Sequence, residues 1–221
     1  MNFNYEQFLE KYGLSTFALK LFACVIMLID HIGAILFPNV IMLRIIGRLS
    51  FPIFCFLIVQ GYIHTRDVKK YFIRLVLFAL ISEIPYDLAF FGRINFGQQN
   101  VFFTLALGLF VIIVIDRANK IISYIAFILA CALAYILKTD YDLFGVLLIM
   151  MLYLVRGKKI LEAITVFATN VGLCVGIQRY ASIAMFPIAL YNGKKGPSLK
   201  YFFYIFYPAH LLILYLIRCI I

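Results

Sequence analysis

The sequence predicts an all-α fold, a polytopic integral membrane helix bundle of about nine transmembrane helices. Two observations carry this prediction. Of the 221 residues, 65% are hydrophobic and 14% are charged, whereas an ordinary soluble domain is about 45–50% apolar and about 25% charged. The apolar runs are also long and unalternating, which favours membrane helices over barrel strands. We treat residues 1–221 as a single transmembrane domain.

Nine apolar stretches are candidate membrane segments, since a helix needs about 20 apolar residues to cross a bilayer. They cover residues 17–37, 41–63, 71–91, 100–116, 121–137, 141–155, 160–177, 180–191 and 201–220. The sixth and the eighth stretches are short enough to be tilted, re-entrant or partial segments.

Lysine and arginine residues indicate the orientation of these segments. Most of the 20 cations lie at the N-terminus or in the connections that follow the second, fourth, sixth and eighth segments. The positive-inside rule makes that side cytoplasmic, so we expect the N-terminus inside and the C-terminus outside. Membrane topology therefore explains the formal net charge of +10, and no nucleic acid partner is expected.

Ionisable side chains interrupt the first three segments at a similar depth. With a rise of 1.5 Å per residue, His31 lies about 21 Å from the cytoplasmic end of the first segment. The outer half of the membrane then holds Asp30, His31, Arg48, Glu83 and Asp87, and Asn100 and Thr104 open the fourth segment. Buried charges cost several kcal/mol unless they face a partner, the bundle interior or water. The set predicts either a hydrated cavity or interhelical pairs, such as Arg48 with Asp30 or Glu83.

His31 is the predicted general base, because a neutral imidazole is cheaper to bury than a charge and accepts a proton near neutral pH. Asp30 points about 100° away from His31 on a helix, so Glu83 or Asp87 is expected to orient the imidazole. His210, at mid-depth in the last segment, is the rival base. None of the five cysteines has metal-ligand spacing, and no metal site is expected.

A second polar cluster, GYIHTRDVKKYFIR, lies at the cytoplasmic ends of the second and third segments. It holds His64, Arg66, Lys69, Lys70 and Arg74. These side chains suit contact with anionic lipids. They also suit a polyphosphate ligand, which Arg66 and Arg74 would grip bidentately.

Four stretches in the same order resemble the TraX family of bacterial membrane proteins. They are LKLFACVIMLIDHIG, the run over residues 43–90, NVFFTLALGLF and YFFYIFYPAHL. The combination of DHIG, GRLSFP, HTR and SEIPYD is specific, whereas residues 120–195 carry little motif content. The best-known member of the family is implicated in N-terminal acetylation of conjugative pilin, and related membrane acyltransferases use cytoplasmic acetyl-CoA. The resemblance also implies the bacterial inner, or plasma, membrane as the location.

From this resemblance we expect transfer of an acetyl group from acetyl-CoA to an amine or hydroxyl acceptor at the outer half of the membrane. The expected catalytic residues are His31, Asp30, Arg48, Glu83 and Asn100, with Arg48, Asn100 or Thr104 stabilising the oxyanion. The residues expected to hold the acetyl-CoA are His64, Arg66, Lys70 and Arg74. The expected partners are acetyl-CoA, membrane lipids and an acceptor that is a protein N-terminus, a glycan or a lipid head group. A transporter or exporter, and a non-catalytic assembly protein for a surface structure, remain as alternatives.

Overall fold

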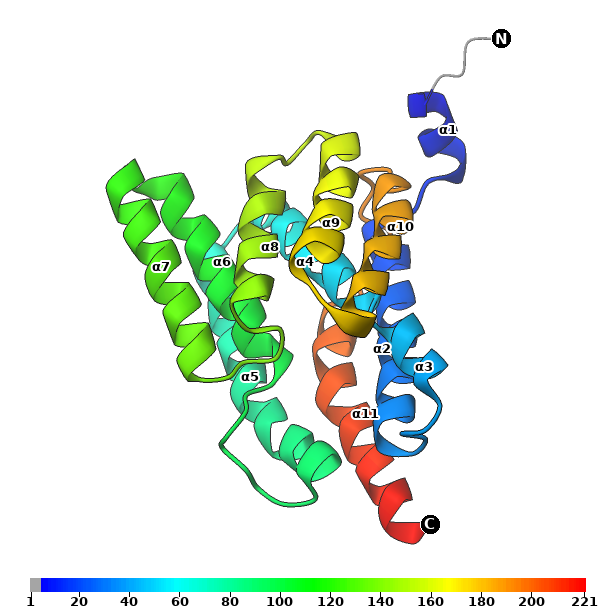
Figure 1. Ribbon diagram of the computed structural model, residues 1–221. Helices are drawn as coiled ribbons and strands as arrows, with labels where there is room; N and C mark the ends of the chain where they lie inside the picture. The colour runs from blue at the N-terminus through cyan, green and yellow to red at the C-terminus, as the bar shows by residue number, and fades with distance from the viewer. Residues whose placement is uncertain (1–4) are drawn as a thin grey trace.

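The computed structural model describes residues 5–221 and confirms the all-α fold (Figure 1). The elements are α1 (Tyr5–Tyr12), α2 (Thr16–Ile35), α3 (Ile41–Gly47), α4 (Ser50–His64), α5 (Val68–Phe91), α6 (Val101–Arg117), α7 (Lys120–Ile136), α8 (Asp142–Leu154), α9 (Lys159–Leu173), the 3₁₀ helix η1 (Gly176–Ala184), α10 (Met185–Ala189) and α11 (Lys200–Ile220). Over the described range no strand forms, and two isolated bridges, Leu14 with Tyr191 and Gln99 with Thr139, tie distant connections together.

Three helical stretches in the described chain are long and apolar enough to cross a membrane. They are Thr16–Ile35, Ile41–His64 and Tyr201–Ile220. Two shorter helices, Lys120–Ile136 and Asp142–Leu154, are also apolar. These helices support a membrane protein. The count of nine crossings and the side on which the N-terminus lies stay predictions.

The connections gather at the two ends of the bundle (Figure 1). Helix α1, the start of α2 and the α6/α7 and α8/α9 connections lie at one end, and the α5/α6 connection and the C-terminus lie at the other. The first end carries Arg117, Lys120, Arg156 and Lys158, and we call it the basic end. These four cations come from two of the connections that the sequence predicted to lie on one side of the membrane.

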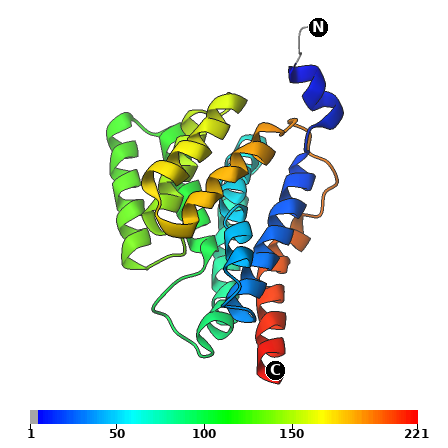
Figure 2. The same cartoon turned by 45° about the vertical axis from the view of Figure 1, so that its right-hand side comes forward.

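Helix α7 lies at the edge of the bundle (Figures 1 and 2), and many of its large apolar side chains are exposed. Ile128 and Leu129 are each 62% exposed, whereas Ala130 and Ala134 are buried against α6 and α8. A helix that presents large aliphatic side chains outward and small ones inward is suited to a lipid environment.

The eighth predicted segment is not a continuous helix. It folds as the 3₁₀ helix η1 followed by the five-residue helix α10. The sixth is a single helix of 13 residues, α8, which is about 20 Å long at 1.5 Å per residue. Both segments are therefore shorter than a full bilayer crossing.

The second predicted segment is broken into α3 and α4, and the turn between them begins at Arg48. Pro52 lies in the first turn of α4, where its missing amide hydrogen costs nothing. Gly47 packs so closely on α2 that an added Cβ would lie 2.1 Å from the Cβ and Oδ1 of Asp30. This close approach brings the arginines of α3 and of the turn to the side chain of Asp30.

We expect Gly47→Ala to destabilise the protein by about 1–3 kcal/mol, the usual range for overpacking a tight contact. Asp30 cannot move aside, because two arginines hold its carboxylate. Gly172 on α9 has open space around it, so Gly172→Ala is the matched control and should not destabilise the protein. Thermal unfolding in detergent compares the two. Equal melting of Gly47→Ala and wild type would contradict the packing argument.

Candidate functional site

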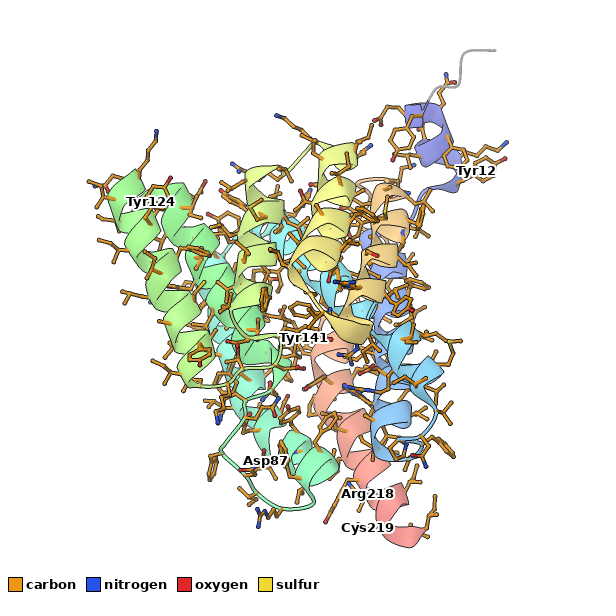
Figure 3. All side chains as sticks on the ribbon, in the orientation of Figure 1. Tyr12, Asp87, Tyr124, Tyr141, Arg218 and Cys219 are labelled. Atoms are coloured by element: carbon orange, nitrogen blue, oxygen red, sulfur yellow. The ribbon has the colours of Figure 1, made fainter. Side chains whose placement is uncertain are left out.

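A cavity of about 260 Å³ lies between α2, the α3/α4 turn, α5 and α11. We call it the histidine cavity, and its lining includes Asp30, His31, Arg48, Tyr86, Asp140 and Tyr207. Figure 3 labels Tyr141, another lining residue, near the middle of the bundle, with Asp87 and Arg218 nearer to the C-terminal end. The cavity brings together three of the residues predicted to be catalytic, Asp30, His31 and Arg48.

Asp30 is held by two arginines. Its Oδ2 lies 2.6 Å from Nη1 of Arg44 and 2.6 Å from Nη2 of Arg48, and its Oδ1 accepts a second hydrogen bond from Arg48 at 2.7 Å. This is the interhelical pair that the sequence offered as the alternative to a catalytic role. Asp140 lines the same cavity as Arg48. Burial raises the pKa of Asp140 to about 6, against the opposing effect of Arg48.

His31 is oriented by His210, and not by the Glu83 or Asp87 carboxylate that the sequence suggested. Nδ1 of His31 lies 2.6 Å from Nε2 of His210, and Nδ1 of His210 lies 2.6 Å from the carbonyl oxygen of Phe206. A carbonyl only accepts, so Nδ1 of His210 carries a proton and its Nε2 accepts from Nδ1 of His31. The Nε2 of His31 is then left with a free lone pair.

The two histidines therefore have different roles in the structure. Both ring nitrogens of His210 are engaged in hydrogen bonds, and His210 is not among the residues that line the histidine cavity. His31 does line the cavity, and it is only 8% exposed. Between the rival bases of the sequence, the geometry favours His31.

Glu83 and Asn100 contact each other away from the cavity lining. The side-chain amide of Asn100 donates to Oε2 of Glu83 at 2.5 Å and to the carbonyl oxygen of Ala79 at 2.8 Å, while its Oδ1 caps α6 by accepting from the Phe102 amide. Asp87 accepts from the backbone amide of Asn95. These predicted site residues thus fasten α5 to the start of α6 and to the connection between them.

The hydroxyl of Thr104 is also occupied. It donates to the carbonyl oxygen of Asp140 and lies 3.0 Å from Oγ1 of Thr139. Arg48, Asn100 and Thr104 were the three candidates for stabilising an oxyanion. Asn100 and Thr104 are engaged outside the cavity lining, whereas Arg48 lines the histidine cavity and pairs there with Asp30.

A second cavity, of about 340 Å³, is lined by the start of α2, the end of α4, the start of α5 and the connection before α11. We call it the basic cavity, because Lys20, His64, Arg74 and Lys195 are among its lining residues. Arg74 lies over the ring of Tyr71 at 5.8 Å, and its Nε is buried without a hydrogen bond. Of the predicted acetyl-CoA residues, His64 and Arg74 line this cavity, whereas Arg66 and Lys70 do not.

Lys20 and Lys195 were missed as site residues by sequence reasoning. Lys195 reaches the cavity because the connection before α11 is bonded to the start of α2: the Thr16 amide donates to the Lys194 carbonyl, and the Phe17 amide to the Lys195 carbonyl. The sequence signal was the run YNGKKGPS, which reads as a cation-bearing turn and says nothing of its long-range partner.

The two cavities share a wall. Met27, Phe54, Val101 and Tyr207 line both of them. Along α2, Lys20 and Met27 line the basic cavity and Met27 and His31 line the histidine cavity. At 1.5 Å per residue, the step from Lys20 to Met27 is about 10 Å and the step from Met27 to His31 is about 6 Å. Lys20 and His31 are thus about 16 Å apart along α2, with the shared wall between them.

Comparisons with known proteins agree with the sequence motifs. The chain is 30% identical over 232 residues to the probable fimbrial assembly protein FimC, serogroup H1, of Dichelobacter nodosus, covering 90% of this chain and 94% of that protein. It is 36% identical over 90 residues to the uncharacterized protein RP591 of Rickettsia prowazekii (strain Madrid E), covering 41% of this chain and 33% of that protein. No solved structure matches. The TraX protein model matches residues 15–218, and the chain therefore belongs to the TraX family.

Proposed function

We propose that this chain is a membrane-embedded acetyltransferase that moves an acetyl group from acetyl-CoA to an amine or hydroxyl acceptor. The observation that supports it best is the pair of cavities that share a wall, one lined by cations and the other by a histidine with a free Nε2. In this proposal the chain crosses the bacterial inner membrane several times, with the basic end in the cytoplasm, where acetyl-CoA is found.

The basic cavity is the proposed site for acetyl-CoA. Lys20, Arg74 and Lys195 would contact its phosphates, since these side chains are the cations among the lining. The pantetheine arm would follow the apolar and aromatic lining, which includes Leu57 and Phe102, toward the shared wall. The thioester would then meet the acceptor at Met27 and Tyr207, next to His31.

In the proposed reaction the acceptor nitrogen or oxygen attacks the carbonyl carbon of the thioester. Nε2 of His31 takes the proton that the acceptor loses, and a new N–C or O–C bond forms. The tetrahedral intermediate collapses by breaking the C–S bond, and the sulfur leaves as the CoA thiol with the proton from His31. The products are the acetylated acceptor and CoA, and no oxidant or reductant is needed.

A non-catalytic role in assembling a surface structure is the second candidate. It is favoured by the name of the relative from Dichelobacter nodosus, a probable fimbrial assembly protein. That name also agrees with an acetyltransferase whose acceptor is a fimbrial subunit. The two candidates differ in whether acetyl-CoA is consumed.

The test is to incubate the purified, nanodisc-embedded protein with acetyl-labelled acetyl-CoA, with and without a membrane extract. We expect labelled acceptor and one free thiol for each acetyl group transferred. Neither label transfer nor thiol release would contradict the enzyme and support the assembly role. Solute flux in proteoliposomes without thiol release would instead support a transporter.

For the basic cavity, we expect Arg74→Ala to weaken acetyl-CoA binding about tenfold at low salt, the loss of one charged contact to phosphate. The effect should shrink as salt rises, because the site is partly exposed. Lys70→Ala is the matched control: Lys70 lies 3.2 Å from Asp67, its side chain is 77% exposed, and it does not line the cavity. Calorimetric titration with acetyl-CoA measures both variants. If both variants bind acetyl-CoA with equal affinity, Arg74 does not contact this ligand, and its charge serves membrane topology alone.

A further inference from the structure

Tyr207 is the residue in the shared wall whose polar group is left without an acceptor. Its side chain lines both cavities and is 3% exposed. Its hydroxyl proton has no acceptor within the described chain. A buried hydroxyl without a partner costs about 1–3 kcal/mol, so its position calls for a physical reason.

The surroundings of this hydroxyl leave its proton free to be donated. The Val101 amide faces the Tyr207 oxygen at the start of α6. That amide is itself a donor and cannot accept the phenol proton. Val101 and Tyr207 both line the shared wall, so a ligand bound there would supply the acceptor that the protein does not.

Tyr207 also lies beside the proposed base. Its ring packs edge-on against His31, with centroids 5.9 Å apart, and against His210, with centroids 5.8 Å apart. A group bound in the histidine cavity would therefore meet both the imidazole of His31 and the phenol of Tyr207. Two of the sequence candidates are engaged outside both cavity linings, Asn100 with Glu83 and Thr104 with the Asp140 carbonyl, whereas Arg48 lines the histidine cavity and pairs there with Asp30.

We propose that Tyr207 is a catalytic residue that donates its hydroxyl proton as a hydrogen bond to the carbonyl oxygen of the acetyl thioester. This inference rests on the proposed acetyltransferase function. As the acceptor attacks and His31 takes its proton, negative charge builds on that oxygen, and the hydrogen bond strengthens. When the C–S bond breaks, the carbonyl re-forms and the phenol keeps its proton throughout. Tyr207 thus stabilises the oxyanion without changing its own protonation.

Tyr207→Phe removes only the hydroxyl and tests the proposal. We expect kcat to fall about a hundredfold or more, as for other single oxyanion donors, with the affinity for acetyl-CoA unchanged. The variant should melt no lower than wild type, because it loses an unpaired buried polar group. Tyr215→Phe, on the same helix but lining neither cavity, is the matched control and should keep wild-type kcat.

A second measurement separates donation from a structural role. In the His31→Ala protein, which should bind acetyl-CoA without turning it over, the infrared carbonyl band of ¹³C-labelled acetyl-CoA should lie at lower frequency than in solution. Adding Tyr207→Phe should remove that shift. Retention of the shift, or of wild-type kcat in Tyr207→Phe alone, would overturn the inference while leaving acetyl transfer intact. If wild-type protein neither binds nor consumes acetyl-CoA, the proposed function fails, and this inference fails with it.

Discussion

His31→Ala should reduce acetyl transfer by about a hundredfold or more, the usual contribution of a general base. The protein should still fold, because the substitution removes a polar group from a buried site and leaves the Asp30 ion pairs in place. Affinity for acetyl-CoA should be unchanged, since His31 lines the histidine cavity and not the basic cavity. Initial rates of thiol release, with the acceptor saturating, measure the loss.

His210→Ala is the control for this prediction. His210 fixes the tautomer of His31 by accepting a hydrogen bond from its Nδ1. The loss of His210 should therefore lower transfer less than the loss of His31 itself. His210→Gln should recover part of the rate, because a side-chain amide oxygen can also accept from Nδ1 of His31. A His31→Ala protein with near-normal transfer, beside an inactive His210→Ala protein, would place the base on α11.

The helices of this protein could be predicted from hydrophobic runs, because a bilayer-facing helix needs a long apolar stretch whatever its neighbours are. The break at Arg48 could not, since it depends on how tightly α3 packs on α2 through Gly47. The sequence also could not show that residues 180–191 form a 3₁₀ helix and a short α10. Hydropathy depends only on which residues a stretch contains. The break at Arg48 and the 3₁₀ helix depend on how the helices pack.

The sequence predicted the level at which the site residues lie along the helices, but only part of the directions in which their side chains point. A rise per residue gives the level of a side chain, and on that basis Asp30, His31 and Arg48 were brought together correctly. The way each helix is rotated about its axis follows from packing, and Glu83 turns toward Asn100. His210 could be found only as a rival base, because nothing in the sequence sets α11 beside α2 at that register.

Asp30→Ala should destabilise the protein by about 3–5 kcal/mol, because it leaves two guanidinium groups without their carboxylate in a largely buried place. Arg44→Met is the milder control. The Arg44 side chain is 24% exposed, against 13% for Arg48, and Asp30 keeps its pair with Arg48 when Arg44 is lost. Thermal unfolding in detergent, with the yield of folded protein as a second readout, compares the two variants.

The triple variant Asp30→Leu, Arg44→Met, Arg48→Met decides whether this cluster is structural or also catalytic. Replacing a buried ion cluster by apolar side chains of similar volume is often neutral or stabilising, so folding should recover relative to Asp30→Ala. If the cluster only joins α3 and the turn to α2, the folded triple variant should keep a substantial rate of transfer, because His31, His210 and Tyr207 are untouched. A folded triple variant without transfer would instead show that Arg48 or Asp30 acts on the substrate, as the sequence first suggested.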